Sequence, residues 1–490
     1  MTPTQTAGIS GFGMYVPSHR VKLDHWCQWY GQSSEKIQAV VGRSFRMRGP
    51  RENVYTMAAT AVLRLIEQYD VDPARIRFLA LGTESSTDNS AGSVVIKGML
   101  NEILPDYGRN PIGRHCEVPE FKHACLGGIY GIKNAARFLA CEPEDTAAIV
   151  VSSDVAEYAR GSSGEPTQGA GAVAVLLEKK PSILSLHLPW SGTASDYRIV
   201  DFRKPMSRVH SEAQRANGQI RDFPVFNGKY STTCYLDATL KALDDLFRRR
   251  GVSAGQYLRD LAAVFMHRPY RKMPESGLAM GYLLALARGD EQDQQSLAEL
   301  ASEAQVSAEE VIKEVTSSPD VRLMVDDRRL MDEAFPKANT LLKALRTHHE
   351  FTNLMDKLSF GANTMMDIGN LYTAALPAWM AAGLEQAAHD GTDLAGREIL
   401  LMGYGSGDAA EAIPASLVPG WEEAAKKIDL ARTLEGGLNL AQQEYEDLHD
   451  FGLGENLPEP AHAVFFLDRI GDSTEGTFID QGIEYYSFQS

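Results

Sequence analysis

The sequence is poor in cysteine and has no long hydrophobic run. Only five of its 490 residues are cysteines, at positions 27, 116, 125, 141 and 234, and no two of them form a CxxC pair. This spacing predicts neither a disulfide framework nor a zinc site. No apolar run is long enough to span a membrane, and the first residues, MTPTQTAGISGFG, lack the basic and apolar segments of a signal peptide. We therefore expect a cytoplasmic protein that is not inserted in a membrane.

Positive charge is also scarce. Lys and Arg total 48 against 65 Asp and Glu, which gives a formal net charge of −17. This excess argues against general nucleic-acid binding and against docking on anionic membranes, although an anionic small ligand needs only a local basic patch. Hydrophobic residues make up 44% and charged residues 23% of the chain, as in ordinary globular proteins. The length allows two or three domains, or two closely packed repeated halves.

Alternating strand and helix patterns predict a layered α/β fold. In the first half, strands are expected at 8–17, 76–85, 146–154 and 169–178, and helices at 54–68 and from about 125 to 139. The second half repeats this order loosely, with strands at 261–267, 397–407 and 462–468 and helices around 236–247, 275–287 and 371–387. In each half a buried strand leads to a chemically capable residue, Glu84 and His267, which suggests a duplicated fold.

The two predicted halves are residues 1–185 and 186–490. Within the second, residues 289–346 are rich in charge and helical in pattern (EQDQQSLAELASEAQVSAEEVIKEV). We interpret this segment as a helical insertion, and a solvated helical face is the ordinary reading of its charges. The sequence assigns it no catalytic role.

Cys125 stands two residues before Gly127 and Gly128, at the start of an amphipathic helix. Ile129 and Ile132 begin an apolar stripe with helical spacing, so the helix should start close to the cysteine. Unpaired N–H groups at a helix start favour a thiolate, and the glycines leave room for another chain or a ligand to approach the backbone. In the alternative interpretation the cysteine is a small buried hydrophobe and the glycines serve helix packing.

Two further side chains follow buried strands. Glu84 comes after FLALG, at the kind of strand end where α/β proteins bind ligands, and a partly desolvated glutamate can shuttle a proton. His267 ends AAVFMH and is followed by Arg268, Arg271 and Lys272. An imidazole can hydrogen-bond a substrate carbonyl, and the neighbouring cations can bind a phosphorylated ligand. The structural alternatives are a capping carboxylate and a satisfied core histidine.

Two loops could complete a pocket. In DIGNLYTAAL, Asn370 precedes a helix and has an amide that can donate and accept, or it is a plain N-cap. In LLMGYGSGDAAE, a strand runs into Gly405, Ser406 and Gly407, whose N–H groups can stabilise an oxyanion, or which form only a tight turn.

Taken in order, these motifs resemble the 3-hydroxy-3-methylglutaryl-CoA synthase family of thiolase-like condensing enzymes. The similar stretches cover most of the chain and are GTES (82–85), HACLGG (123–128), SSDVAEY (152–158), TQGAGAVAVLLE (167–178), DFRKP (201–205), FPVFNGKYSTTCYL (223–236), FMHRPYRKM (265–273), GNLYTAAL (369–376) and YGSG (404–407). The resemblance implies a thiolase-like αβαβα fold made of two duplicated halves, with the helical insertion in the second.

The resemblance also implies a mechanism in which an acetyl group is condensed with acetoacetyl-CoA. Cys125 would take the acetyl group of acetyl-CoA, Glu84 would act as acid and base, and His267 would hydrogen-bond the ketone of acetoacetyl-CoA, with Asn370 nearby. The N–H groups of Cys125 and Ser406 would form the oxyanion hole, and hydrolysis would release 3-hydroxy-3-methylglutaryl-CoA. A thiolate forms a thioester readily, and an enolate needs a base and preorganised donors.

The family further implies the substrate contacts and partners. Lys272 would lie near the CoA phosphates, and Tyr158 and Thr167 would line the acyl pocket. No metal or cofactor is required, since the CoA thioesters are substrates, and a homodimer is expected.

Several departures from the family pattern leave the acceptor open. The motif YTAALP has Ala375 and Pro377 where a serine and an aromatic are common, Leu126 replaces an aromatic, residues 51–53 (REN) are less acidic, and the insertion is long. A first alternative is therefore a β-branching synthase of polyketide biosynthesis, which condenses onto a β-ketoacyl carrier protein. A second is a non-catalytic relative that binds an acyl-CoA.

Overall fold

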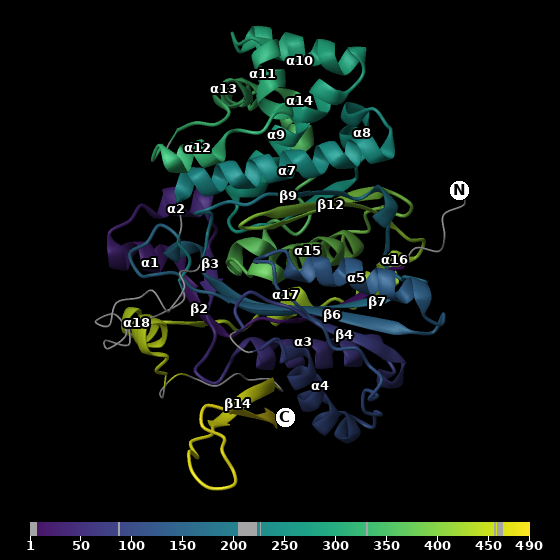
Figure 1. Cartoon of the computed structure of the whole chain (residues 1–490), viewed down its shortest axis with the longest axis vertical. Helices are drawn as coiled ribbons and strands as arrows, with labels where there is room; N and C mark the ends of the chain where they lie inside the picture. The colour runs from purple at the N-terminus through teal and green to yellow at the C-terminus, as the bar shows by residue number, and fades with distance from the viewer. Residues whose placement is uncertain are drawn as a thin grey trace.

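Helices and sheets are stacked in five layers (Figure 1). The computed structural model describes residues 7–86, 89–203, 223–225, 227–329, 332–454, 457 and 464–490. The outer helices are α7 (Gly228–Arg250) and α9 (Lys272–Arg288) on one side and α3 (Val54–Tyr69) and α4 (Gly92–Ile103) on the other, and the central helices are α5 (Gly127–Cys141) and α15 (Ala375–His389). This arrangement confirms the predicted αβαβα layering.

Both sheet layers belong to one hydrogen-bonded sheet of ten strands in the described part of the chain. The order is β10-β11-β12-β8-β1-β7-β6-β4-β5, and β9 also pairs with β12. The strands are β1 (Gly8–Tyr15), β4 (Ile76–Gly82), β5 (Glu120–Phe121), β6 (Ala147–Ala156), β7 (Gly169–Glu178), β8 (Leu184–Leu186), β9 (Gly192–Ser195), β10 (Ala263–Met266), β11 (Glu398–Gly405) and β12 (Ala409–Leu417). The short pairing of β1 with β8 joins the two layers.

The two layers repeat one pattern of strand pairing. In the first, β4 is parallel to β6, β6 is antiparallel to β7, and β7 is antiparallel to β1. In the second, β10 is parallel to β11, β11 is antiparallel to β12, and β12 is antiparallel to β8 and β9. The predicted duplication is therefore confirmed, and β4 and β10 occupy equivalent positions. The predicted boundary at residue 185 falls inside β8 and stays a prediction.

The central helices are buried because both of their faces meet a sheet. On α15 almost every side chain is buried, including that of Trp379, and α5 buries its apolar stripe from Ile129 to Leu139. Pro377 lies in the first turn of α15, where a missing N–H is tolerated. These two helices begin at the centre of the molecule, which places the residues before them between the layers.

The predicted helical insertion is confirmed and forms a compact cap at one end of the molecule (Figure 1). Its helices are α10 (Glu291–Glu303), α11 (Ala308–Thr316), α12 (Val321–Asp326) and α13 (Pro336–Leu345), and α14 (His349–Asp356) extends the cap beyond the predicted end at residue 346. Their apolar stripes, for example Leu297, Val311 and Leu341, are buried and continuous with the main core. The charged residues form the solvated outer faces, as the pattern predicted.

Smaller elements complete the fold. They are β2 (His19–Lys22), β3 (Ser44–Arg46), β13 (Leu438–Asn439), β14 (Val464–Ile470), β15 (Glu484–Gln489), α1 (Leu23–Tyr30), α2 (Ser34–Val40), α8 (Ala254–Asp260), α16 (Trp421–Ala425), α17 (Leu430–Thr433) and α18 (Gln442–Phe451). The sheet β13-β2-β3 shares a hydrophobic cluster with α1 and α18. No helix of the described residues is long and apolar enough to cross a membrane.

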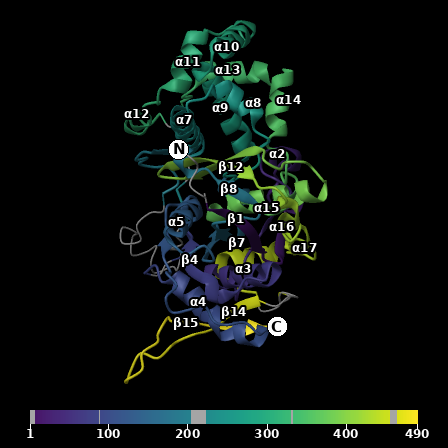
Figure 2. The same cartoon turned by 90° about the vertical axis from the view of Figure 1, so that its right-hand side faces the viewer.

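Two strand assignments differ from the sequence prediction. The strand predicted at 462–468 is β14, but among the described strands it pairs with β15 alone, in a hairpin whose loop projects from the molecule (Figure 2). The strand that completes the second layer is β12, which the sequence analysis missed. Its pattern contains Pro414, and a proline argues against a central strand because it cannot donate a ladder hydrogen bond.

Candidate active site

Most of the predicted site residues line one cavity. It has a volume of about 770 Å³ and lies between the sheet layers and the insertion. Seven of the eight predicted residues line it, namely Cys125, Tyr158, Thr167, His267, Lys272, Asn370 and Ser406. The eighth, Glu84, lines a second cavity of about 970 Å³, but its carboxylate reaches the cysteine. The fold therefore gathers all eight residues from segments that are far apart in the sequence.

The loop before α5 presents Cys125. Ala124 has a φ of +42°, a left-handed conformation that is uncommon for a residue with a Cβ, and the helix begins two residues after the cysteine. Gly127 and Gly128 do not leave room for a ligand, because a Cβ on either would collide with Phe121 or Ser152 of the neighbouring strands. The packing interpretation of these glycines is therefore correct.

The environment of Cys125 favours the thiol, not the thiolate. Burial raises its pKa well above the ordinary value, and the nearby carboxylates of Glu84 and Asp154 raise it further. The predicted bias towards the thiolate is wrong, because burial and the carboxylates of Glu84, Asp154 and Asp201 all raise the pKa of the thiol. The thiol donates a hydrogen bond to Glu84 Oε2 at 3.5 Å. The Glu84 carboxylate therefore lies within hydrogen-bond reach of the thiol proton.

The loop that carries Glu84 is fixed by a residue that sequence reasoning missed. Asp154, on β6, is fully buried and accepts hydrogen bonds from the N–H groups of Glu84 (2.8 Å), Ser85 (3.0 Å) and Thr373 (3.0 Å) and from the hydroxyl of Thr83 (2.9 Å). Burial raises its pKa, and these hydrogen bonds oppose that shift. The available signal was a carboxylate inside a predicted buried strand.

Aromatic side chains form the wall of the pocket around the thiol. Cys125 packs with Tyr158, Tyr372 and the partly buried Phe202. Asn370 Nδ2 donates to the hydroxyl of Tyr158 at 3.3 Å, while its Oδ1 accepts from the N–H of Tyr372 at 2.9 Å. Asn370 therefore acts as a local cap and also contacts the pocket wall. Tyr372 was not singled out by sequence, because its position depends on a φ of +46°.

His267 reaches the cavity from the end of β10. The side chain is buried, its ring stacks with Tyr404 at a centroid distance of 6.3 Å, and burial lowers its pKa to about 3. Its Nδ1 has no hydrogen-bond partner within the described residues. A neutral imidazole of this kind can hydrogen-bond a substrate carbonyl without bringing a charge.

The basic cluster predicted after His267 is largely engaged within the protein. Arg268 is buried, donates to the carbonyl of Ala362 at 3.2 Å and lies over the ring of Trp379. Arg271 and Lys272 both pair with Glu275, at 3.6 and 2.7 Å. Of the three predicted cations, only Lys272 lines the cavity.

The turn containing Ser406 is held by buried charges. Asp201 accepts hydrogen bonds from Tyr404 (2.7 Å) and from the N–H of Gly407 (3.2 Å). The N–H of Gly407 is therefore not available to an oxyanion. Asp201, Asp408 and Cys234 have ligand atoms close enough for a metal ion, and so do His348, His349 and Glu350 on the insertion. In the buried cluster, Arg198 pairs with Asp408 at 3.2 Å. The guanidinium therefore supplies the positive charge that a metal ion would otherwise bring.

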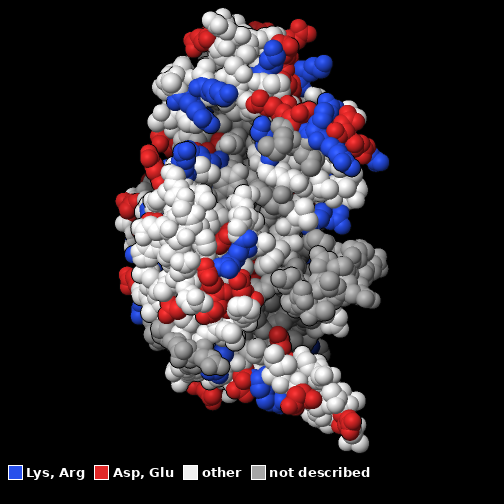
Figure 3. Space-filling model, turned by 90° about the vertical axis from the view of Figure 1, so that its left-hand side faces the viewer, with Lys and Arg blue, Asp and Glu red and all other residues white. Residues whose placement is uncertain are grey.

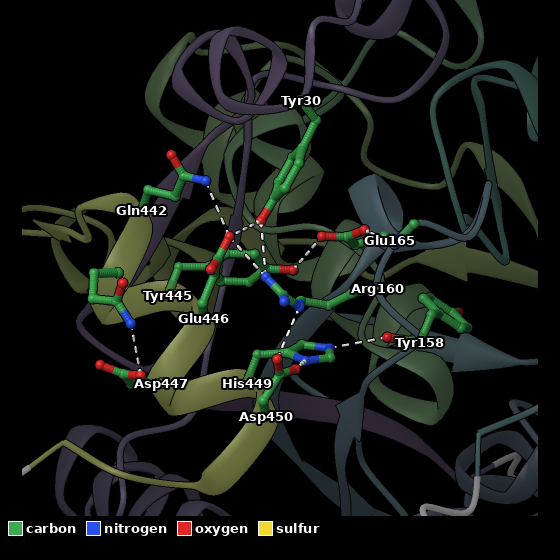
Figure 4. Close-up of polar contacts among 12 residues, drawn as sticks. Tyr30, Tyr158, Arg160, Glu165, Gln442, Tyr445, Glu446, Asp447, His449 and Asp450 are labelled. Carbon is green, nitrogen blue, oxygen red and sulfur yellow. Dashed lines mark hydrogen bonds and ion pairs between the residues drawn. The ribbon is translucent and has the colours of Figure 1, made fainter. Parts of the chain in front are cut away.

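Helix α18 fixes the loop that carries Tyr158 and Thr167 (Figure 4). The buried ring of His449 contacts Asp450 Oδ1 through Nδ1 at 2.8 Å and the carbonyl of Tyr158 through Nε2 at 2.9 Å. Arg160, on the same loop, pairs with Glu446 (2.8 Å) and Asp450 (3.0 Å). No local motif marks this contact, because its partners are almost 300 residues apart.

Comparison with known proteins agrees with this site. The family described as hydroxymethylglutaryl-coenzyme A synthase N terminal matches residues 3–181, and the corresponding C-terminal family matches residues 219–451. A hydroxymethylglutaryl-CoA synthase of Haloferax volcanii is 27% identical, over 81% of this chain and 80% of its own.

Solved structures give the same result. MvaS in complex with 3-hydroxy-3-methylglutaryl coenzyme A has a TM-score of 0.74 and 27% identity, covering 98% of this chain and 99% of its own. The curacin-pathway HMG synthase in complex with an acetyl donor carrier protein has a TM-score of 0.64 over 91% and 88% of the two chains, but at 18% identity it shows the fold alone.

The layered fold and the buried cysteine at a helix start define a thiolase-like condensing enzyme, an acyltransferase. Within that class, the two family matches together cover more than half of the chain. The chain belongs to the hydroxymethylglutaryl-CoA synthase family.

Proposed function

We propose that the protein condenses acetyl-CoA with acetoacetyl-CoA to give 3-hydroxy-3-methylglutaryl-CoA and free CoA. The observation that carries this proposal is the hydrogen bond from the Cys125 thiol to Glu84, in a site that also holds the neutral His267. Family membership and the likeness to a synthase solved with 3-hydroxy-3-methylglutaryl-CoA support it.

In the first step, the sulfur of Cys125 attacks the acetyl-CoA carbonyl while Glu84 accepts the thiol proton. The C–S bond to CoA breaks, and the leaving CoA thiolate takes that proton from Glu84, which restores the carboxylate. In the second step, Glu84 removes a proton from the methyl group of acetyl-Cys125, and the resulting carbanion forms a C–C bond to the ketone carbon of acetoacetyl-CoA.

His267 donates a hydrogen bond to the ketone oxygen as negative charge develops there, and Asn370 lies on the same pocket wall. Glu84 returns its proton to the new alkoxide. Water then hydrolyses the thioester to Cys125, which restores the thiol and releases the product. The N–H groups of Cys125 and Ser406 are proposed as oxyanion donors, and Tyr158 and Thr167 as acyl-pocket residues.

The reaction as written requires no metal or other cofactor, because acid, base and nucleophile all come from the chain. We further propose that the enzyme is a cytoplasmic homodimer that supplies the mevalonate route to isoprenoids. These points rest on family resemblance, and size-exclusion chromatography with light scattering tests the dimer.

Intact mass after incubation with acetyl-CoA tests the first step. We expect one acetyl adduct on the wild type and on Cys141→Ala, which removes an exposed cysteine, and none on Cys125→Ala. Absence of the adduct from the wild type would overturn the enzyme proposal in favour of a non-catalytic binder.

Product mass after addition of the acceptor tests the second step. We expect 3-hydroxy-3-methylglutaryl-CoA from acetoacetyl-CoA. Turnover with acetoacetyl carrier protein and none with the CoA thioester would instead identify a β-branching synthase.

A further inference from the structure

One face of the insertion helix α13 forms part of the cavity that holds Cys125. Asn339, Leu342, Lys343 and Arg346 line this cavity. They are spaced at i, i+3, i+4 and i+7, the spacing of a single helix face. Lys343 and Arg346 are exposed, in contrast to the buried catalytic end of the cavity. The insertion therefore contributes two cations to the mouth of the site.

The acidic side chains of this mouth already have partners. Glu333 accepts a hydrogen bond from Asn339 at 2.7 Å, and Asp332 pairs with Arg329 at 3.5 Å. Glu275 is the acid that pairs with both Arg271 and Lys272. Figure 3 shows both signs of charge mixed over the insertion, at the top of the molecule.

Lys343 and Arg346 differ from these paired groups. Within the described residues, neither has a salt bridge or a side-chain hydrogen bond. By contrast, Lys337 on the same helix pairs with Glu310 at 3.3 Å and does not line the cavity. An exposed guanidinium and an ammonium one helical turn apart suit phosphate groups, which the guanidinium binds by paired hydrogen bonds and the ammonium as a point charge.

We propose that Lys343 and Arg346 form a subsite for the phosphates of the adenosine 3′,5′-diphosphate end of CoA. This inference rests on the proposed function, because it assumes a CoA thioester in the cavity. A pantetheine arm on a carrier protein has one phosphodiester and lacks the adenosine 3′-phosphate. The subsite thus gives the insertion a role, which is to favour free CoA thioesters over carrier-bound ones.

A donor series tests the subsite through the rate of acetyl transfer to Cys125, followed by intact mass. The donors are acetyl-CoA, acetyl-3′-dephospho-CoA and acetylpantetheine. In the wild type we expect the second-order rate constant to fall along the series. In Lys343→Ala/Arg346→Ala we expect acetyl-CoA to react about tenfold more slowly, the effect of one contact of about 1.4 kcal/mol, and acetylpantetheine to react at the wild-type rate.

The matched control is Arg322→Ala/Lys337→Ala, which removes the same charge from the insertion at two residues outside the cavity. We expect its rates to match the wild type for all three donors. An equal loss with acetylpantetheine in Lys343→Ala/Arg346→Ala would show a structural effect and overturn the subsite. An unchanged rate with acetyl-CoA would overturn it as well.

Binding in the Cys125→Ala background separates the two proposals, because it requires no chemistry. By calorimetry we expect CoA to bind about tenfold more weakly when Lys343 and Arg346 are also replaced, and the loss to shrink at high ionic strength, where charge contacts are screened. Equal CoA affinity with and without the two cations would overturn the subsite. If the wild type is not acetylated but this loss of affinity is seen, the proposed function fails and the subsite stands.

Discussion

The two halves of the molecule place different chemistry on the same scaffold. The equivalent strands β4 and β10 run parallel to β6 and β11 and deliver Glu84 and His267 to the site. The first half supplies a carboxylate, and the second supplies an imidazole that is neutral at physiological pH. The duplicated topology therefore fixes where functional groups stand, and the residue type at each position decides what they do.

The two halves also differ in how their buried carboxylates are stabilised. In the first, Asp154 is surrounded by N–H and hydroxyl donors, and no ion pair to it is found among the described residues. In the second, buried carboxylates are paired with the guanidinium of Arg198, and His267 has no charged neighbour that shifts its pKa. Negative charge is thus concentrated near the thiol, from which the proposed mechanism removes a proton.

Replacing Glu84, the carboxylate of the first half, should cause the largest loss of activity. Glu84→Gln keeps the size of the side chain but cannot accept the thiol proton, so we expect turnover to fall by about 10² to 10⁴. Steady-state turnover and the rate of Cys125 acetylation measure the loss. Glu144→Gln, which alters an exposed carboxylate paired with Lys180, should react like the wild type. A loss of less than tenfold in Glu84→Gln would assign the base elsewhere.

Replacing Asp154 should have the next largest effect. In Asp154→Asn, an amide NH₂ would face groups that can only donate, such as the N–H of Glu84 and that of Thr373. A buried donor left unpaired costs about 1 to 3 kcal/mol. We expect a loss of that size in the free energy of unfolding, measured in urea, and a loss of about tenfold or more in acetylation rate as the Glu84 loop shifts. Unchanged acetylation would show that Asp154 does not position Glu84.

Local patterns were sufficient for the elements that carry the site. The strand predicted at 169–178 has exactly these bounds in β7, and the helix predicted near Cys125 begins at Gly127. Both succeed because apolar periodicity reflects burial directly. The positions of Glu84 and His267 also follow from sequence, since both come at the ends of apolar strands.

The features that escaped prediction depend on contacts between distant segments. Burial and three carboxylates raise the pKa of Cys125, and none of these influences is visible in HACLGG. The anchoring of Tyr158 by His449 links two segments separated by most of the chain. Arg268 could not be recognised as buried, because its partner Ala362 belongs to a segment beyond the insertion.

The neutral state of His267 predicts a pH-dependent stability. Its pKa is about 3 in the folded protein against 6.5 for an ordinary histidine, so between these values the unfolded chain binds a proton that the folded chain does not. Its contribution to stability is therefore lost as the pH falls below 6.5. Between pH 7.5 and 5 the wild type should lose about 2 kcal/mol more than His267→Gln, measured by urea unfolding, because one pKa unit corresponds to about 1.4 kcal/mol. His115→Gln, at an exposed position, should keep the wild-type slope, and equal slopes in all three proteins would mean that His267 is protonated in the folded state.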